Sequence, residues 1–596
     1  MRPSPMNQCG KKTSPVFGPA RLCGLTAAAS SSILRAVKTQ RLSGQIVDLR
    51  ARRIFPGTVE WAGGRITRIR ADAGVRERRF IAPGFVDAHI HIESSLLPPA
   101  EFARWAVVHG TVATVSDPHE IANVLGVPGI DFMIREGRRS PFKFNFGAPS
   151  CVPATTFETA GAALDARTVA GLLARPEIKY LSEVMNFPGV LARDGSLMTM
   201  IAAAKKHGKP VDGHAPGLRG SLAARYAAAG ITTDHECFTL PEARDKLKAR
   251  MKILIREGSA ARNFAALASL LKTHPAQVMF CCDDLHPDLL MRRHLDEHVR
   301  RALRGGADRF DVLRCASVNP VEHYGLDVGL LRPGDPADFI VFEGWANLKV
   351  RRTYLRGELV ARDGRSLLPR QPVKTPNNFK AKPRRVGDFI VKVGRRVPSP
   401  PLGAERSPRP TLHVIEALNG QLITRHGQAH PRLVAGVIRT DPKRDLLKIA
   451  VINRYAPAAP VAVAFIKGFG LKAGAIASSV AHDSHNIVAV GADDESLCAA
   501  VNLVIKARGG LSVVGRGRRA VLPLPIAGLM SDRDGRAVAR RYTQLDAMAK
   551  QLGSRLDAPF MTLSFMALLV IPDLKLSDRG LFSAASWGFV PLQPPN

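Results

Sequence analysis

Short apolar runs alternate with longer amphipathic stretches through the middle of this chain. Strands that alternate with helix-length segments are typical of repeated βα units, which build a parallel sheet. Eight such units within about 250 residues match the size of a (β/α)8 barrel. We therefore predict an α/β fold with a TIM-like barrel over 82–330. Its eight strands are expected at 85–89, 111–116, 142–146, 179–183, 211–214, 231–235, 252–255 and 278–282.

Strand-like patterns with turns also occur on both sides of this middle region, at 44–70 and 336–360. They predict one small β domain built from both flanks, 44–81 together with 331–365. A Pro- and Arg-rich stretch, 366–410, is interpreted as a linker. The remaining residues, 411–596, predict an additional C-terminal α+β domain with a helix near 535–552.

Length and composition indicate an ordinary globular protein. A single core stops growing at roughly 250 to 300 residues, so a chain of 596 residues with 45% hydrophobic and 23% charged positions predicts several domains. The longest apolar candidate, 560–571, is too short to span a membrane and contains Thr562 and Ser564. Eight cysteines without regular spacing favour a reducing cytoplasm over a disulfide framework.

The formal charge of +34 raises the possibility of nucleic-acid binding. Much of this charge lies in two stretches, because 1–44 holds seven Lys and Arg without an acid and 366–410 holds eleven with two acids. No aromatic platform or recognition motif accompanies the charge, so we expect no specific nucleic-acid partner. Residues 1–43 are interpreted as a basic, disordered leader, and whether they belong to the mature protein stays open.

Potential metal ligands fall at the carboxyl ends of the predicted strands, which is where the reacting groups of barrel enzymes lie. Each residue alone is weak evidence, because a single strand-end His is more often a satisfied core residue than a ligand. Their joint occurrence in the order His-x-His, Glu, His, His, Asp predicts a metal site. The members are His89, His91, Glu183, His214, His235 and Asp283.

Imidazoles combined with carboxylates suit borderline divalent metals, with Mn or Fe(II) favoured and Zn a further candidate. A carboxylate such as Glu183 can bridge two ions, and two ions that share a water lower its pKa enough to give hydroxide near neutral pH. Other metal motifs are excluded. His91 and Glu93 mimic half of the cytidine-deaminase signature, but its Pro-Cys-x-x-Cys half is absent, and His119-Glu120 lacks the second His of a zincin.

Longer stretches resemble the amidohydrolase superfamily and, within it, the adenine deaminases. The longest match is PGFVDAHIHIESSLLPPAEFARWAVVHGTVATVSDPHEIANVLG, and SEVMNFPGV, DGHAPG, TTDHE, CDDLHPDLL and LRPGDPADF are also similar to that family. HDSHNIVAVGADD and LPLPIAGLMS extend the resemblance into the C-terminal region. The resemblance covers the chain from about residue 44 to its end.

This resemblance implies hydrolytic deamination of adenine to hypoxanthine and ammonia at a binuclear metal centre. It implies that Glu183 bridges the metals, with Lys179 as its only rival, and that Asp283 is both ligand and proton carrier. Glu120 and His119 would serve as further catalytic groups. Candidates for contacts to substrate or to an additional metal are Asp117, Glu93, Asp284 and His485.

Three alternatives stay open at this point. Asp117, His119 and Glu120 could merely cap the helix that follows, since Asp before Pro is a common helix start. The site could act on another cyclic amide or amidine, as in hydantoinases and dihydroorotases, because a fold does not fix its substrate. A basic nucleic-acid-binding protein with an inactive barrel is the remaining class. As partners we expect adenine as a small-molecule substrate and further copies of the chain in a homo-oligomer, without a membrane partner.

Overall fold

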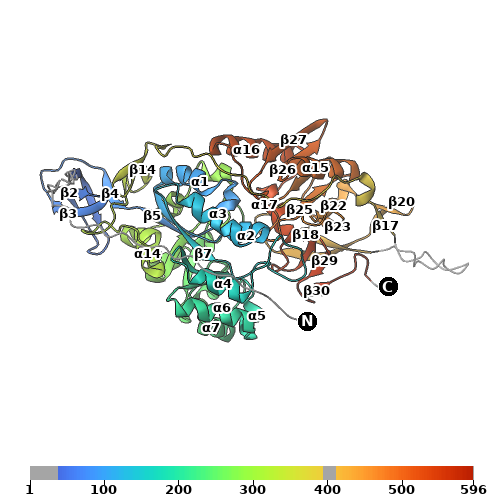
Figure 1. Cartoon of the computed structure of the whole chain (residues 1–596), viewed down its shortest axis with the longest axis horizontal. Helices are drawn as coiled ribbons and strands as arrows, with labels where there is room; N and C mark the ends of the chain where they lie inside the picture. Colours follow the sequence, from blue (N-terminus) through green and yellow to red (C-terminus); the bar gives the residue numbers. More distant parts are fainter. Residues whose placement is uncertain (1–37, 394–410, 595–596) are drawn as a thin grey trace, which may run out of the picture. The chain divides into compact units, whose positions relative to one another are not determined.

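The computed structural model describes residues 38–393 and 411–594. Its centre is a ring of eight parallel strands, which confirms the predicted barrel. Figure 1 labels β5 (Phe85–Ile90) and β7 (Lys143–Ala148) of this ring. Five strands form one sheet and three form another. Thr232 N donates to Val211 O at one junction, and a parallel bridge joins Ile90 to Asp283 at the other. The strands are β5 (Phe85–Ile90), β6 (Thr111–Ser116), β7 (Lys143–Ala148), β8 (Ile178–Val184), β9 (Val211–Gly213), β10 (Thr233–Asp234), β11 (Lys252–Arg256) and β12 (Val278–Cys281).

Burial on both faces explains why these strands read as apolar runs. Every residue of β5, β6, β9, β10 and β12 is buried, as expected for a parallel sheet covered by helices. The helices that follow successive strands are α1 (Pro99–Ala106), α2 (His119–Leu125), α3 (Val127–Gly137), α4 (Ala166–Leu173), α5 (Phe187–Leu191), α6 (Gly195–Lys206), α7 (Gly220–Ala228), α8 (Leu240–Lys248), α9 (Phe264–Leu267), α10 (Leu270–Thr273), α11 (Pro287–Leu290), α12 (Leu295–Arg304), α13 (Arg309–Leu313) and α14 (Asn319–Tyr324).

A second sheet takes its strands from both flanks of the barrel. Its order is β16-β15-β14-β13-β4-β1-β2-β3, and β4 of the first flank pairs with β13 of the second through Pro83 and Phe339. The indole of Trp61 packs edge-on against Phe339 and Tyr354, which ties the two flanks into one core. The strands are β1 (Gln40–Asp48), β2 (Arg53–Ala62), β3 (Arg65–Ala71), β4 (Phe80–Pro83), β13 (Phe339–Glu343), β14 (Lys349–Leu355), β15 (Glu358–Arg362) and β16 (Arg365–Ser366).

The C-terminal region contains another eight-stranded sheet, in the order β19-β18-β23-β22-β25-β24-β26-β27. Helix α15 (Asp494–Lys506) contacts β24, β25 and β26, and α16 (Gly535–Gln551) contacts β26 and β27. Helix α16 confirms the helix predicted near 535–552. The strands are β18 (Leu412–Ala417), β19 (Thr424–Ala429), β22 (Leu447–Ile452), β23 (Val461–Lys467), β24 (Ala475–Ser478), β25 (Ile487–Gly491), β26 (Gly510–Gly515) and β27 (Arg518–Pro523).

Short elements complete this region. Helix α17 (Pro559–Ser564) overlaps the apolar stretch 560–571, and no helix in 38–393 or 411–594 is long and apolar enough to cross a membrane. The small strands are β17 (Val391–Lys392), β20 (Arg432–Val434), β21 (Val437–Arg439), β28 (Leu574–Ser577), β29 (Gly580–Ser583) and β30 (Gly588–Phe589).

Two proposed domain boundaries differ from the elements observed. Strand β1 begins at Gln40, inside the range interpreted as a leader, while 1–37 lie outside the described residues. The described part of the 366–410 range is packed rather than free. Phe379 and Phe389 are buried in the core around α15, and β17 pairs with β21. Two phenylalanines among many Pro and Arg gave too weak a hydrophobic signal to reveal this packing.

Candidate metal centre and active site

The six predicted metal ligands converge at the carboxyl ends of the barrel strands. His89 lies in β5 and His91 directly follows it, Glu183 lies in β8, and the others follow β9, β10 and β12. None of the six side chains is more than 8% exposed. Burial of this many ionisable groups is costly unless they pair with one another or bind a cation, so their convergence is itself informative. The full set is His89, His91, Glu183, His214, His235 and Asp283.

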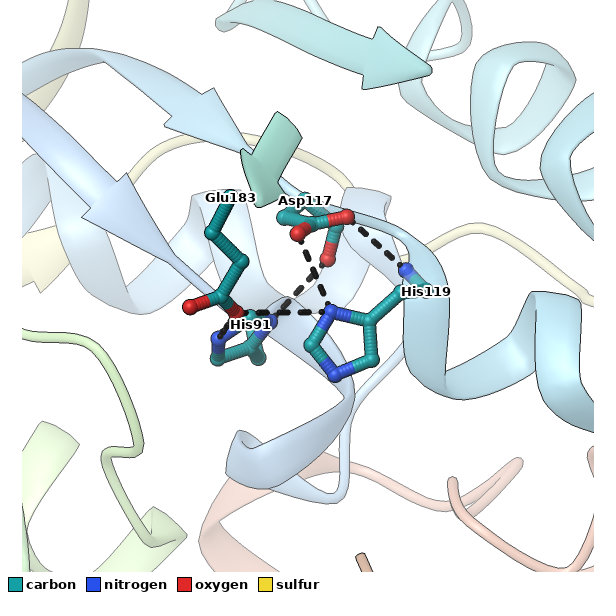
Figure 2. Close-up of side chains that lie close together, drawn as sticks. All are labelled: His91, Asp117, His119 and Glu183. Atoms are coloured by element: carbon teal, nitrogen blue, oxygen red, sulfur yellow. Dashed lines mark hydrogen bonds and ion pairs between the residues drawn. The ribbon is translucent and has the colours of Figure 1, made fainter. Parts of the chain in front are cut away.

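The carboxylate of Glu183 lies between two groups of imidazoles. Its Oε1 is 3.2 Å from Nε2 of His91, which Figure 2 shows as a dashed contact. Its Oε2 is 2.7 Å from Nδ1 of His214 and 3.1 Å from Nε2 of His235. The two oxygens therefore face different imidazoles, which is the arrangement a bridging carboxylate requires. Lys179, the rival for this place, donates its amine to the carbonyl of Pro176 instead.

Asp283 closes the first group of imidazoles. Its Oδ1 lies 3.2 Å from Nε2 of His91 and 3.7 Å from Nε2 of His89, and these two nitrogens are 3.2 Å apart. Ligands held at about 2.1 Å around a tetrahedral ion lie about 3.4 Å from one another. Burial, together with the neighbouring His235, holds the pKa of His89 well below its usual value, so that its ring stays neutral and can offer a lone pair. The donor set therefore fits divalent metal.

A second cluster follows β6, at the start of α2. The Nδ1 atom of His119 lies 3.0 Å from Oδ2 of Asp117 and 3.5 Å from Oε1 of Glu183 (Figure 2). The other carboxylate oxygen of Asp117 accepts a hydrogen bond from the backbone nitrogen of His119. Asp117 thus satisfies the helix start and also orients an imidazole toward the ligand cluster, so the two interpretations of this loop describe one arrangement.

Two further candidate residues lie beside these clusters. Glu93 accepts a hydrogen bond from the backbone nitrogen of Ile121, and burial raises the pKa of its carboxyl to about 7. Asp284 accepts a hydrogen bond of 2.5 Å from the hydroxyl of Ser94. Asp284 also lies 3.9 Å from Nε2 of His482, a residue of the C-terminal region.

The HDSHN sequence, which extends the family resemblance into the C-terminal region, reaches the barrel of its own chain. His482 contacts one carboxylate oxygen of Glu120 through Nδ1, and His485 contacts the other through Nε2. The carboxylate of Asp483 lies 3.7 Å from Nε2 of His119. All these side chains are buried. The loop between β24 and β25 thus lies against the residues that follow β6.

Sequence reasoning missed buried residues that contact the proposed ligands or the segments next to them. Arg256, the last residue of β11, contacts both Glu236 and Asp283 through its Nη1 atom. Arg256 directly follows the seventh predicted strand, 252–255. The rule that reacting groups lie at strand ends would have found it if Arg and Lys side chains had been considered as well as metal ligands. His294 lies 3.1 Å from Oδ2 of Asp87, whose Oδ1 accepts a hydrogen bond from the backbone of Cys282. No strand-end rule points to His294, which precedes α12.

A cavity of 690 Å³ lies over the loops that follow β7, β8, β9 and β10. Met185 and Asn186, which follow Glu183, line it together with Gly217, which follows His214. The C-terminal region supplies Trp587 and the segment 570–572 to its opposite wall. Apolar walls beside a few polar atoms are usual for small-molecule sites. The cavity therefore adjoins the loops next to Glu183 and His214.

Comparison with known proteins agrees with this geometry over most of the chain. Residues 80–360 match the Amidohydrolase family, and residues 421–587 match the Adenine deaminase C-terminal domain. An adenine deaminase of Salinibacter ruber is 56% identical over 92% of this chain and 98% of its own length. Adenine deaminases of Methanosarcina acetivorans and Borreliella burgdorferi are 50% and 45% identical, each over 92% of this chain and 98% and 99% of their own lengths.

Proposed function

This chain belongs to the adenine deaminase family of amidohydrolases, and we propose that it converts adenine and water to hypoxanthine and ammonia. The observation that carries the proposal is the central position of Glu183 among His91, His214 and His235. Relatives named adenine deaminase match nearly the whole chain, including the C-terminal region, and this extent favours adenine over other substrates of amidohydrolase barrels.

The residues at the barrel mouth supply the groups that the reaction needs. A divalent metal pair held by the six ligands would supply hydroxide near neutral pH by lowering the pKa of a water. Asp283 would accept the proton of the attacking water and return it to the amino group of adenine, which leaves as ammonia. The carboxylate and imidazole of Glu120 and His119 would hold a proton near the purine ring, so that negative charge does not build up there. The net change is exchange of the amino group at C6 for oxygen.

The family implies a divalent metal, and we propose two ions, with Mn or Fe(II) favoured and Zn a further candidate. The mixture of four imidazoles and two carboxylates supports this choice, because harder oxygen ligands shift preference toward Mn and Fe(II). Glu93, Asp117 and Asp284 are proposed to contact the substrate or to support a further ion. His485, a fourth candidate from the sequence, faces Ala481 and Glu120 with its two ring nitrogens and is not proposed for this part.

We further propose a cytoplasmic homo-oligomer. In the described ranges six cysteines are free and all six are buried, as suits a reducing compartment. Size-exclusion chromatography with light scattering would test the oligomeric state directly.

One assay tests the function. Purified protein loaded with Mn or Fe(II) is incubated with adenine, and the release of ammonia and the appearance of hypoxanthine are followed together. Hydantoin and dihydropyrimidine are the control substrates. Equal amounts of hypoxanthine and ammonia from adenine would support the proposal. Turnover of a control substrate without turnover of adenine would refute it.

A further inference from the structure

The loop between β24 and β25, residues 479–486, encloses the carboxylate of Glu120. His482 approaches one oxygen of that carboxylate and His485 the other, so that each oxygen has its own imidazole. Glu120 belongs to α2 of the barrel and lies 362 residues from His482 along the chain. Both histidines are no more than 2% exposed, so solvent does not weaken these contacts.

The protonation state of His485 follows from its other ring nitrogen. The backbone nitrogen of Ala481 lies 3.2 Å from Nδ1 of His485 and donates a hydrogen bond to it. Nδ1 must therefore carry a lone pair, and the ring proton lies on Nε2, the atom that contacts Oε2 of Glu120. Burial lowers the pKa of His485, in agreement with a neutral ring that carries its proton on Nε2.

His482 is held by a second, independent contact. Its ring stacks on Phe565 with centroids 4.4 Å apart and planes inclined by 9°. The stack fixes the plane of the imidazole and leaves Nδ1 aimed at Glu120, while Nε2 has no hydrogen-bond partner among the described residues. A ring fixed in this way acts as a rigid donor.

Glu120 in turn contacts the imidazole that reaches the ligand cluster. Its Oε1 lies 3.3 Å from Nε2 of His119, and Nδ1 of His119 lies 3.5 Å from Glu183. Asp483, from the same C-terminal loop, lies 3.7 Å from that Nε2 atom. A continuous chain of polar contacts therefore leads from the C-terminal loop through Glu120 and His119 to the proposed bridging carboxylate.

We infer that the C-terminal region is part of the active site, with His482 and His485 as positioning residues that hold Glu120 for catalysis. This inference rests on the proposed function. His482 contributes a hydrogen bond and His485 a close polar contact to this buried carboxylate, and together they fix both its place and the rotation of its plane. Glu120 and His119 keep their direct part in the reaction, and the two histidines act through Glu120.

The experiment uses the fact that the two histidines contact Glu120 through different ring nitrogens. The amide nitrogen of Asn occupies the position of Nδ1, whereas that of Gln reaches the position of Nε2. We make His482→Asn, His482→Gln, His485→Gln and His485→Asn in the full chain and measure kcat, KM, bound metal and the unfolding midpoint. Loss of a hydrogen bond to a charged group corresponds to about 10- to 100-fold in kcat.

The expected result is a crossed pattern. His482→Asn and His485→Gln keep kcat within about tenfold of the parent, while His482→Gln and His485→Asn lose about 10- to 100-fold, all with unchanged bound metal. If the two histidines had only a structural role, kcat would not favour Asn at position 482 and Gln at position 485. Equal losses for Asn and Gln at either position, or losses that follow metal content, overturn the inference.

A double-mutant cycle gives an independent measurement. In a Glu120→Gln background the His482→Gln change should add little further loss, because residues that act as a unit are not additive. Full additivity overturns the inference.

His426→Gln, on an exposed C-terminal histidine that pairs with His413, is the control and should match the parent. If the parent releases no ammonia from adenine, the proposed function itself fails, whereas an active parent with four equally active variants refutes only the role of the loop.

Discussion

Arg256 and Asp283 form a buried contact at the mouth of the barrel, with Nη1 of the guanidinium against Oδ2 of the carboxylate. The same nitrogen also contacts Glu236, so that one cation compensates the carboxylates of Glu236 and of Asp283, a proposed metal ligand. Oδ1 of Asp283 is left to face His89 and His91. Arg256 thus fixes which oxygen of Asp283 is offered to the centre.

Replacement of Arg256 by Met should therefore cost both stability and activity. Removing one partner of a buried pair leaves an uncompensated charge and costs about 3 to 5 kcal/mol in the free energy of unfolding. Urea denaturation monitored by circular dichroism measures this loss. The control is Arg292→Met, because Arg292 pairs with Asp288 at the surface and exposes 66% of its side chain. Indistinguishable unfolding curves for the two variants would contradict the role given to Arg256.

Glu183→Gln should lower bound metal and kcat together. The amide replaces one oxygen by a nitrogen that does not bind metal well, and Glu183 faces imidazoles on both sides. Metal analysis after gel filtration, with ammonia release measured on the same samples, checks this expectation. Lys179→Met is the matched control on the same strand, since its amine bonds to Pro176 instead. Parent-like metal content and turnover in Glu183→Gln would remove the residue from the centre.

Removal of metal should lower the unfolding temperature reversibly. Without a cation, four imidazoles and two carboxylates are left in a buried cluster, and binding to the folded state alone adds about 2.7 kcal/mol of stability when free metal is 100 times its dissociation constant. Differential scanning calorimetry of chelator-treated protein, before and after addition of Mn, tests the effect. The same midpoint in both samples would show that the cluster does not bind metal. Glu183→Gln should respond less than the parent to added Mn.

His298, on α12, should make the protein less stable as the pH falls. Its Nε2 donates to the carbonyl of Cys281, and burial, assisted by Arg293, lowers the pKa of the ring to about 3. In the unfolded chain the His298 ring has a pKa near 6.5, so below that pH it takes up a proton that the folded protein does not. The contribution of His298 to the free energy of unfolding is therefore complete above pH 6.5 and is lost as the pH falls toward 3. The loss reaches about 2 kcal/mol at pH 5.

The matched variant is His298→Gln, which keeps an amide donor for Cys281 but does not titrate. Its free energy of unfolding should fall less than that of the parent between pH 7 and pH 5, by about 2 kcal/mol. Parallel pH profiles for the two proteins would contradict the prediction. His323, whose pKa burial also lowers to about 3, contributes in the same sense to both proteins and does not affect the difference.

The sequence predicted the barrel well because its information is local. The predicted barrel strands are apolar runs of four to six residues, and the end of each run marks the carboxyl end of its strand. The strand-end rule then located His214 and Asp283 without any knowledge of tertiary structure. Hydrophobic periodicity and the direction of parallel strands were sufficient for the fold and for the convergence of the proposed metal ligands.

The remaining parts of the site depend on contacts between distant segments. Nothing local to His482 indicates that it lies against Glu120, since a polar loop in solvent has the same composition. Arg256 was overlooked because arginine is usually a surface residue, and only its burial beside Asp283 reveals its role. Packing between the barrel and the C-terminal region, rather than propensity, places these residues.

The sheet built from both flanks has a consequence for synthesis of the chain. Strand β4 finds its partner β13 only after the whole barrel between them has been made, because Pro83 pairs with Phe339. At about 5 to 20 residues per second the ribosome needs about 13 to 50 s to cover that distance. Until then one edge of β4 stays unpaired, and synthesis of β13 from the second flank ends this exposure.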